Sequence, residues 1–306
     1  MPTTFLISLE MITSESHFIE KEGYNLHLRR FFTPDAKASI FLLHGSIEDG
    51  RIFYSKSGKG LAPFLAQNGY DVFVADLRGK GKSTPNISPE SDFGQKEAIM
   101  EDMPAFMDYI NQKTGKKPEY MMAHSWGGVI ILSYLARFKH ENLKAQAFFG
   151  SKRDVKVQNI YRWFNIDLLW NKMGTYLVHK HGYLPATKYN IGSDNEAKHF
   201  YLQVNNWVYS DEWIDSFDGF NYAEALQKQK IAPTLHLTGA KDTHSGHPKD
   251  VKRLMVEIGN QEDHHFQVIG KKYGHKHNYN HINLLTHPDA PIDHFQEVLQ
   301  WLKKHY

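Results

Sequence analysis

The sequence contains no cysteine. Disulfide bonds, thiolate catalysis and cysteine-ligated metal centres are therefore excluded as explanations of its stability or its chemistry. The absence does not by itself identify a cellular compartment. Any nucleophile must come from another residue type.

Long apolar runs and an excess of one charge are also missing. No segment approaches the roughly 18 apolar residues of a membrane-spanning helix, and residues 1–10 lack a basic start and are interrupted by Glu10. The 36 basic and 34 acidic residues give a formal net charge of +2, which favours neither nucleic acid nor an anionic membrane as a partner. We therefore expect a cytoplasmic protein without stable membrane insertion.

The composition that remains is that of a globular protein. Hydrophobic residues make up 41% of the chain and charged residues 23%, which is close to the average for folded domains. A chain of 306 residues is long enough for one large α/β domain, or for a core domain with an insertion.

The stretch around Ser125 has the pattern of a sharp turn from a strand to a helix. Residues 119–123 resemble a short buried strand and residues 129–136 suit a buried helix, so the chain must reverse at the serine. Ala123 and Gly127, two residues before and after it, are small enough for a G-x-S-x-G elbow with alanine in place of its first glycine. A serine at an ordinary helix N-cap would fit the pentapeptide about as well, so the context must decide.

Strand and helix patterns alternate on both sides of this turn. Residues 16–32 alternate around Gly23 like an antiparallel hairpin at a sheet edge. Strands separated by helices predict an α/β fold with a mostly parallel sheet and helices on both faces. Apolar strands are expected at 39–44, 71–76, 120–123, 145–149, 233–238 and 265–269, and helices at 61–68, at 95–112, after Ser125 and at 294–304.

This regularity stops between residues 151 and 230. The segment is rich in aromatic residues, and glycine and proline separate short helix-like pieces. Because strand signals return abruptly at 233–238, we predict a helical cap at 151–230, inserted into an α/β core made of residues 1–150 and 231–306. The alternative is a run of ordinary helices that pack on the sheet without forming a pocket.

An activated serine needs a carboxylate that orients its base, and Asp242 is the candidate. It follows a predicted strand that ends at Gly239, and the carboxyl ends of parallel strands are where such sheets place their sites. Asp76 also ends a strand but precedes the serine, whereas a G-x-S-x-G elbow goes with the chain order Ser, Asp, His. Asp250 is less suitable because it begins a helix-like segment. An ordinary turn or helix-capping role is the alternative for Asp242.

The base cannot be chosen from the residues alone. The chain has 19 histidines, and four of them lie in the loop between the last strand and the last helix, from which a base can reach the serine. The spacing of His277 and His281 would also suit a metal on a helix, but the surrounding glycine and asparagines favour a loop, and we expect no metal. The four candidates are His275, His277, His281 and His287.

Two backbone amides are expected to stabilise a negatively charged oxygen. One belongs to Trp126, directly after the nucleophile, and the other to Ser46, in the loop after the strand that ends at His44-Gly45. Residues 79–84 resemble the end of a phosphate-binding loop. That reading fails because the first glycine of the motif would fall at Asp76 and no helix pattern follows.

Taken together, these motifs resemble the α/β-hydrolase superfamily over nearly the whole chain. His44-Gly45-Ser46, residues 76–83, the Ser125 elbow and residues 239–242 occur in that family's order and spacing. The C-terminal part is similar to the acid lipase branch, the gastric and lysosomal lipases. That branch has H-x-D followed by D-A where this chain has His281-Ile282-Asn283 and then Asp289-Ala290. The resemblance implies that His281 is the catalytic histidine.

The resemblance implies a serine hydrolase that cleaves a carboxylic ester through an acyl-enzyme. Ser125 would be the nucleophile, His281 the base and Asp242 the residue that orients it, with no cofactor. The aromatic cap favours a small-molecule ester with an apolar group, and the sequence indicates no oligomeric state. Thioesterase, acyltransferase or carbon–carbon hydrolase chemistry, or a non-catalytic ligand-binding protein, are the alternatives.

Overall fold

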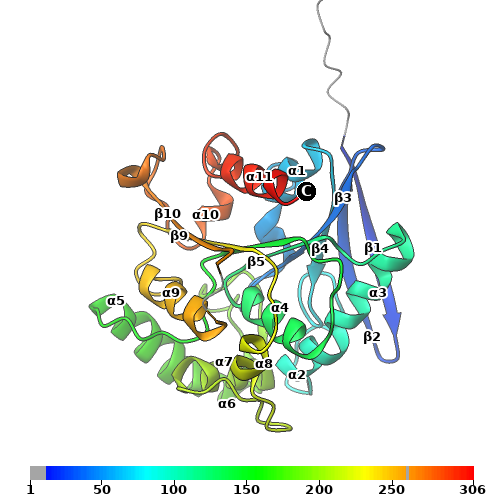
Figure 1. Ribbon diagram of the computed structural model, residues 1–306. Helices are drawn as coiled ribbons and strands as arrows, with labels where there is room; N and C mark the ends of the chain where they lie inside the picture. Colours follow the sequence, from blue (N-terminus) through cyan, green and yellow to red (C-terminus); the bar gives the residue numbers. More distant parts are fainter. Residues whose placement is uncertain (1–11, 260–261) are drawn as a thin grey trace, which may run out of the picture.

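An eight-stranded sheet forms the centre of the protein, whose computed structural model describes residues 12–259 and 262–306 (Figure 1). The strand order is β1-β2-β4-β3-β5-β6-β9-β10. The hairpin of β1 and β2 pairs antiparallel with β4 at one edge, and all later neighbours are parallel, as predicted. The expectation drawn from residues 1–10 lies outside the described residues. The strands are β1 (Thr13–Lys21), β2 (Tyr24–Phe32), β3 (Ala38–Leu43), β4 (Tyr70–Asp76), β5 (Tyr120–His124), β6 (Ala145–Phe149), β9 (Thr234–Gly239) and β10 (His264–Ile269).

Burial of the central strands explains their continuous apolar sequences. Every residue of β3, β4, β5, β6 and β9 is buried, whereas the edge strand β1 has no buried residue. In the parallel ladder Leu43 pairs with Ala123, and Ala123 pairs with Phe148. The carboxyl ends of β3, β5 and β6 therefore meet at one edge of the sheet.

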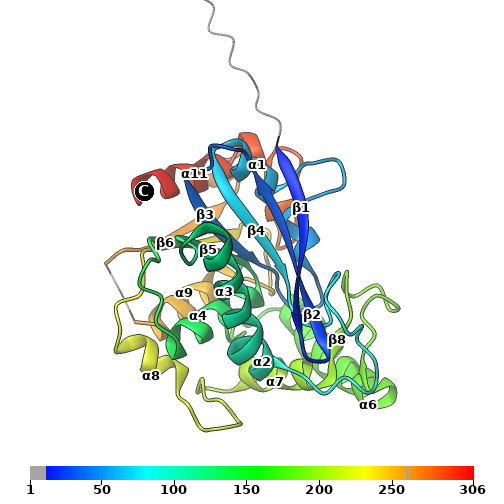
Figure 2. The ribbon, with the colours of Figure 1, turned by 90° about the vertical axis from the view of Figure 1, so that its right-hand side faces the viewer.

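Helices cover both faces of the sheet (Figures 1 and 2). One face carries α1, α10 and α11, whose apolar residues join one buried cluster, and the other carries α3, α4, α8 and α9, which join a second. Among the described residues no helix combines the length and apolar character needed to cross a bilayer. The helices outside residues 151–230 are η1 (Gly50–Phe53), α1 (Leu61–Gln67), α2 (Gln95–Glu97), η2 (Ala98–Asp102), α3 (Met103–Thr114), α4 (Trp126–Arg137), α9 (Pro248–Glu257), η4 (Lys271–Tyr273), α10 (Asn283–Thr286), η5 (Ala290–Ile292) and α11 (Phe295–Lys304).

The helix predicted over residues 95–112 runs from Gln95 to Thr114 and contains a π-helical turn. A wider, π-helical turn, η2, separates α2 from α3. Pro104 occupies the first turn of α3 and has no amide hydrogen to donate, so the regular hydrogen-bond ladder cannot run through this point. The residues at both junctions keep right-handed helical dihedral angles, so the predicted helix is present and differs from the prediction only in this wider turn.

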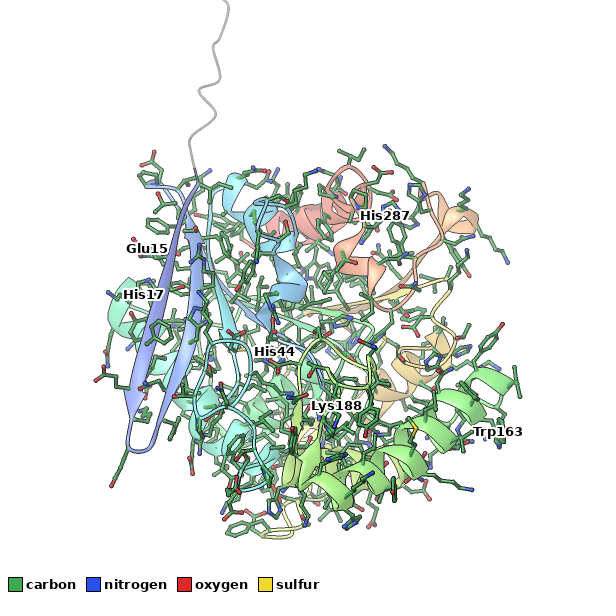
Figure 3. All side chains as sticks on the ribbon, turned by 180° about the vertical axis from the view of Figure 1, so that it is seen from behind. Glu15, His17, His44, Trp163, Lys188 and His287 are labelled. Atoms are coloured by element: carbon green, nitrogen blue, oxygen red, sulfur yellow. The ribbon has the colours of Figure 1, made fainter. Side chains whose placement is uncertain are left out.

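Residues 151–230 connect β6 to β9, and half of them are helical. The long π-helical segment η3 carries Trp163 at its outer end, where the indole is exposed (Figure 3). The elements of this segment are α5 (Ile160–Arg162), η3 (Trp163–Gly174), α6 (Thr175–His181), the paired strands β7 (Tyr183–Leu184) and β8 (Glu196–Ala197), α7 (Lys198–Tyr209) and α8 (Tyr222–Gln227).

An aromatic cluster and a buried ion pair join this segment to the rest of the core. The ring of Trp207 in α7 packs against Trp126 of α4 and against Trp213, with ring centroids 6.3 and 6.0 Å apart. Lys80, in the loop after β4, forms a 2.9 Å ion pair with Glu196 of β8, and both side chains are almost fully buried. The loop that resembles a phosphate-binding motif therefore fastens residues 151–230 to the core.

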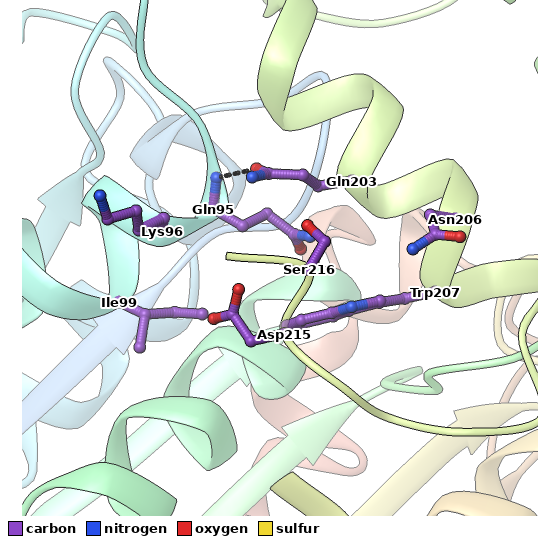
Figure 4. A pocket seen from close by; sticks show the side chains of 8 residues that line it. All are labelled: Gln95, Lys96, Ile99, Gln203, Asn206, Trp207, Asp215 and Ser216. Carbon is purple, nitrogen blue, oxygen red and sulfur yellow. Dashed lines mark hydrogen bonds between the residues drawn. The ribbon is translucent and has the colours of Figure 1, made fainter. Parts of the chain in front are cut away.

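A small pocket marks a third junction, between α2 and α7 (Figure 4). The Gln95 amide donates a 2.6 Å hydrogen bond to Oε1 of Gln203 beside it. The pocket holds only about 10 Å³, which is room for about one water molecule. It is a packing gap and not a ligand site.

Candidate active site

Ser125 occupies the predicted turn between β5 and α4. Its backbone has φ of 50° and ψ of −122°, in a region that non-glycine residues rarely adopt, and its amide donates to the carbonyl of Phe149 over 2.8 Å. A methyl group at Gly127 would overlap the carbonyl oxygen of His44, which explains the glycine there. Ala123, which stands where the motif usually has glycine, fits as a fully buried residue of β5.

Asp242 and His281 form a close pair. Asp242 lies three residues after β9, and His281 lies in the loop between β10 and α10. The His281 ring donates from Nδ1 to Oδ2 of Asp242 over 2.6 Å, and the amide of Gly246 donates to the other carboxylate oxygen over 2.9 Å. This arrangement fixes the tautomer of His281, so that Nε2 is left to accept a proton.

Burial and charge set the protonation of this pair. Burial alone would raise the pKa of Asp242, but the His281 ring and the hydrogen bonds outweigh it and lower that pKa to about 2. Burial lowers the pKa of His281, against the opposing charge of Asp242, and the charges of His124 and Lys152 lower it further. A carboxylate beside a neutral imidazole is the form that a general base requires.

The two amides proposed for the oxyanion lie beside Ser125. Ser46 and Trp126 line the same cavity as the serine, and a methyl group at Gly45 would lie 2.8 Å from the Cβ of Ser125. The Ser46 amide donates to no acceptor within the described parts of the chain. Trp126 is the first residue of α4, where an amide has no partner inside the helix.

A second buried pair, Glu48 and His124, supports these loops and was missed at the sequence level. The His124 ring contacts Oε1 of Glu48 through Nδ1 at 2.6 Å and the carbonyl oxygen of His281 through Nε2 at 3.0 Å. Both partners are acceptors, because interactions with His124 and Gly45 lower the pKa of Glu48 against its burial. The ring therefore donates from both nitrogens, and Glu48 raises the pKa of His124 although burial opposes this.

The contacts of this pair connect three parts of the site. Glu48 also accepts a hydrogen bond from the backbone amide of Gly45, directly before Ser46, over 2.5 Å. His124, its partner, contacts the backbone of His281. His124 directly precedes Ser125 in the chain. A histidine beside the nucleophile was the signal available in the sequence, but its partner, 76 residues away, could not be identified from it.

The candidate residues face one cavity of about 1090 Å³. Ser125, Asp242 and His281 line it from the sheet side, together with Ser46 and Trp126. Other residues of the core and residues of the 151–230 segment line the remainder, and the apolar ones from that segment are Val155, Ile166, Trp170, Ile191, Val204 and Val208. The cavity is large enough for a lipid-sized or drug-sized molecule.

The other three histidines of the loop lie elsewhere. His275 contacts Glu297 of α11 at 2.9 Å, and His277 contacts Asp289 at 2.7 Å. His277, Asp289 and His287 bring their ligand atoms within 4.8 Å of one another, and no other group of this kind occurs within residues 12–259 and 262–306. Figure 3 labels His287, a partly buried residue directly after α10. None of the three lines the cavity, so this cluster is separate from the candidate triad.

Comparison with known proteins places the chain among hydrolases. Residues 34–277 match the profile of the family described as "Serine aminopeptidase, S33". Human lipase member K is 23% identical over 324 aligned positions, which cover 86% of this chain and 79% of the lipase. The human lysosomal acid lipase/cholesteryl ester hydrolase is 29% identical over 165 positions, which cover 49% of this chain and only 41% of that protein.

A solved structure extends the likeness over almost the entire fold. A soluble variant of monoglyceride lipase from Saccharomyces cerevisiae, in complex with a substrate analogue, superposes with a TM-score of 0.66. The match covers 97% of both chains at 18% identity. The predicted α/β-hydrolase fold and the resemblance to acid lipases are both confirmed.

Proposed function

Because this chain belongs to the serine aminopeptidase S33 family of α/β hydrolases, we propose that it hydrolyses small carboxylic esters with an apolar group through an acyl-enzyme on Ser125. The observation that carries the proposal is the common cavity of Ser125, His281 and Asp242, with the 2.6 Å His281–Asp242 hydrogen bond. The relatives named as lipases support the coarser statement, that the protein is an esterase-like or lipase-like hydrolase.

The proposed reaction has two steps. Ser125 Oγ attacks the ester carbonyl while Nε2 of His281 takes its proton, and the amides of Ser46 and Trp126 donate to the developing oxyanion. The alcohol then leaves with the proton from His281. A water molecule gives a proton to His281 as it attacks the acyl group, and His281 returns this proton to Ser125 Oγ as the acid leaves.

In this proposal residues 151–230 act as a cap that binds the apolar part of the ester. Ile166 and Trp170 of η3 and Val204 and Val208 of α7 supply much of the apolar lining, and burial of an apolar group against them excludes water from the reacting carbonyl. The core then consists of residues 1–150 and 231–306. No step of the proposed reaction needs a metal or cofactor.

The charges that line the cavity favour an ester over the peptide substrate in the family's name. An aminopeptidase binds a positively charged amino terminus, which calls for a free carboxylate. Glu48 and Asp242 are the carboxylates that line the cavity among the described residues, and both are already bound, to His124 and His281. Amino-acid 4-nitroanilides should therefore be poor substrates.

The direct test is hydrolysis of 4-nitrophenyl esters with acyl chains from C2 to C16. Ser125→Ala should lower kcat by at least about a thousandfold, because the hydroxyl forms the intermediate. Ser133→Ala, which removes a buried hydroxyl within α4 and outside the cavity, is the matched control and should keep most of the activity.

Labelling with a fluorophosphonate separates the alternatives. Activity that survives in Ser125→Ala would overturn the choice of nucleophile. A wild-type protein that is labelled at Ser125 but cleaves none of the esters would favour thioester, acyl-transfer or carbon–carbon bond chemistry. Absence of both labelling and hydrolysis would favour a non-catalytic ligand-binding protein.

A further inference from the structure

Lys152 is a buried cation in the cavity with no part in the proposed reaction. It follows β6 by three residues and is only 8% exposed. It lines the same cavity as Ser125 and His281. Within the described residues its ammonium group makes no hydrogen bond and no ion pair. A buried lysine without a partner is uncommon, because loss of hydration is costly for a charge.

The residues next to Lys152 show what a structural role would look like. Arg153 is also buried, and it binds Glu257 at 2.7 Å and the carbonyl of Trp207 at 2.6 Å. Asp154 is buried and binds Arg253 at 2.6 Å. These two side chains are held by protein partners, whereas the lysine beside them faces the cavity.

The carboxylates near Lys152 already have other partners. Asp242 accepts from His281 and Gly246, and Glu48 accepts from His124 and Gly45. The third, Asp250, accepts the amides of Lys156 and Val157, each over 3.1 Å.

These carboxylates do not compensate for the burial of the lysine. Burial lowers the pKa of Lys152, although Asp242, Asp250 and Glu48 oppose this. An anion bound against the ammonium would restore the missing counter-charge.

We propose that the substrate carries a carboxylate as well as an ester. Lys152 binds this carboxylate, and the apolar residues that line the cavity bind the chain between the two groups. This inference rests on the proposed ester hydrolysis and narrows its substrate class. A single ammonium matches one negative charge, whereas a phosphate dianion would leave a second charge uncompensated in a buried place. The half-ester of a dicarboxylic acid has the required chemistry.

Binding to a Ser125→Ala background tests the inference without turnover. Monomethyl suberate and dimethyl suberate have the same chain, and only the first carries a carboxylate. Calorimetry should show at least about tenfold tighter binding of the monomethyl ester, as expected for a buried charge-assisted hydrogen bond. Adding Lys152→Met, which keeps an unbranched chain of similar length, should abolish this preference.

Two further variants separate the role of Lys152 from general effects. Lys152→Arg keeps the charge and should retain most of the preference for the monomethyl ester. Retention would show that the loss in Lys152→Met comes from the missing charge and not from misfolding. Lys241 also lines the cavity but is exposed, so Lys241→Met should change the preference much less. If Lys152→Met lowers the melting temperature of the Ser125→Ala protein, Lys152→Gln replaces it in the test.

The outcomes distinguish this inference from the function on which it rests. Equal affinity for the two esters, no detectable binding of either, or a preference that survives Lys152→Met would each overturn the carboxylate site. A preference that depends on Lys152, in a wild-type protein that hydrolyses neither compound, would support the site and contradict the proposed ester hydrolysis. Hydrolysis of both esters at equal kcat/KM would support the hydrolase and contradict the site.

Discussion

Gly150 leaves room for the imidazole of His281 because it has no side chain. It follows β6 with φ of +63°, and a methyl group on it would lie 2.8 Å from Nδ1 of His281. Gly150→Ala should therefore displace the imidazole and lower kcat by roughly a hundredfold, since a 1 Å misplacement of a catalytic group has an effect of this size.

Gly115 provides the matched control for this prediction. Its φ is +81° and no atom lies within 4 Å of an added methyl group, so Gly115→Ala strains the backbone without touching the site. Both variants should lose about 1 kcal/mol of unfolding free energy in urea, from the cost of a side chain at positive φ. Equal activity of the two would show that Gly150 does not position His281.

Single residues also show which parts of the candidate site local sequence patterns can predict. Ser125 and Asp242 could be named because each stands at the end of an apolar strand, a signal that lies within a few neighbouring residues. His281 needed the family resemblance, since four histidines share its loop and only tertiary contacts distinguish them. Lys152 gave no signal at all, because the absence of a partner is a property of the folded chain.

Among the elements, the ribbon of β7 and β8 depends on one ion pair. Glu196 of β8 binds Lys80 at 2.9 Å and also accepts the amide of Ile47, next to Ser46. Glu196→Gln leaves the buried lysine without a counter-charge and should lower the unfolding free energy by about 3 kcal/mol. Unfolding in urea measures this, and kcat should fall as well because the Ser46 loop loses its anchor.

An exposed ion pair gives the comparison. Glu224 pairs with Lys228 on the surface of α8, where water screens the charges, so Glu224→Gln should leave both the unfolding midpoint and kcat unchanged. A Glu196→Gln protein that behaves in the same way would show that this ion pair does not fasten β8.

The elements themselves were predictable to different degrees. The strands of the core agree with their apolar runs to within a residue or two, because burial on both faces leaves a continuous signal. The π-helical turn between α2 and α3 was not predicted, although Pro104, which has no amide hydrogen to donate, indicates a change in the hydrogen-bond ladder there. The way in which α7 packs on α4 depends on rings such as Trp207 and Trp126, and sequence pattern does not pair residues so far apart.

For the molecule as a whole, buried histidine should make the fold sensitive to acid. His236 in β9 is fully buried, and neither of its ring nitrogens has a hydrogen-bond partner in the described chain. Burial lowers its pKa to about 3. Between pH 6.5 and 3 the unfolded chain binds a proton that the folded chain does not. The unfolding free energy therefore falls as the pH falls, by about 2 kcal/mol at pH 5 for this residue.

His236→Leu removes that contribution. Its unfolding free energy, measured in urea, should fall about 2 kcal/mol less than that of the wild type between pH 8 and pH 5. The measurement at pH 8 serves as the control, because the ring is neutral there in both the folded and the unfolded chain. Parallel pH dependences of the two proteins would contradict the prediction.

The position of β6 in the sheet has a consequence for folding during synthesis. Gln146 of β6 pairs with Thr234 of β9, so the strand that covers this edge of β6 is made only after the whole of residues 151–230. Until then the backbone edge of this mostly apolar strand stays open to other nascent chains. We therefore expect the yield of folded protein to depend more on chaperones that act at the ribosome than on the stability of the finished fold. Chains released before β9 is made should aggregate.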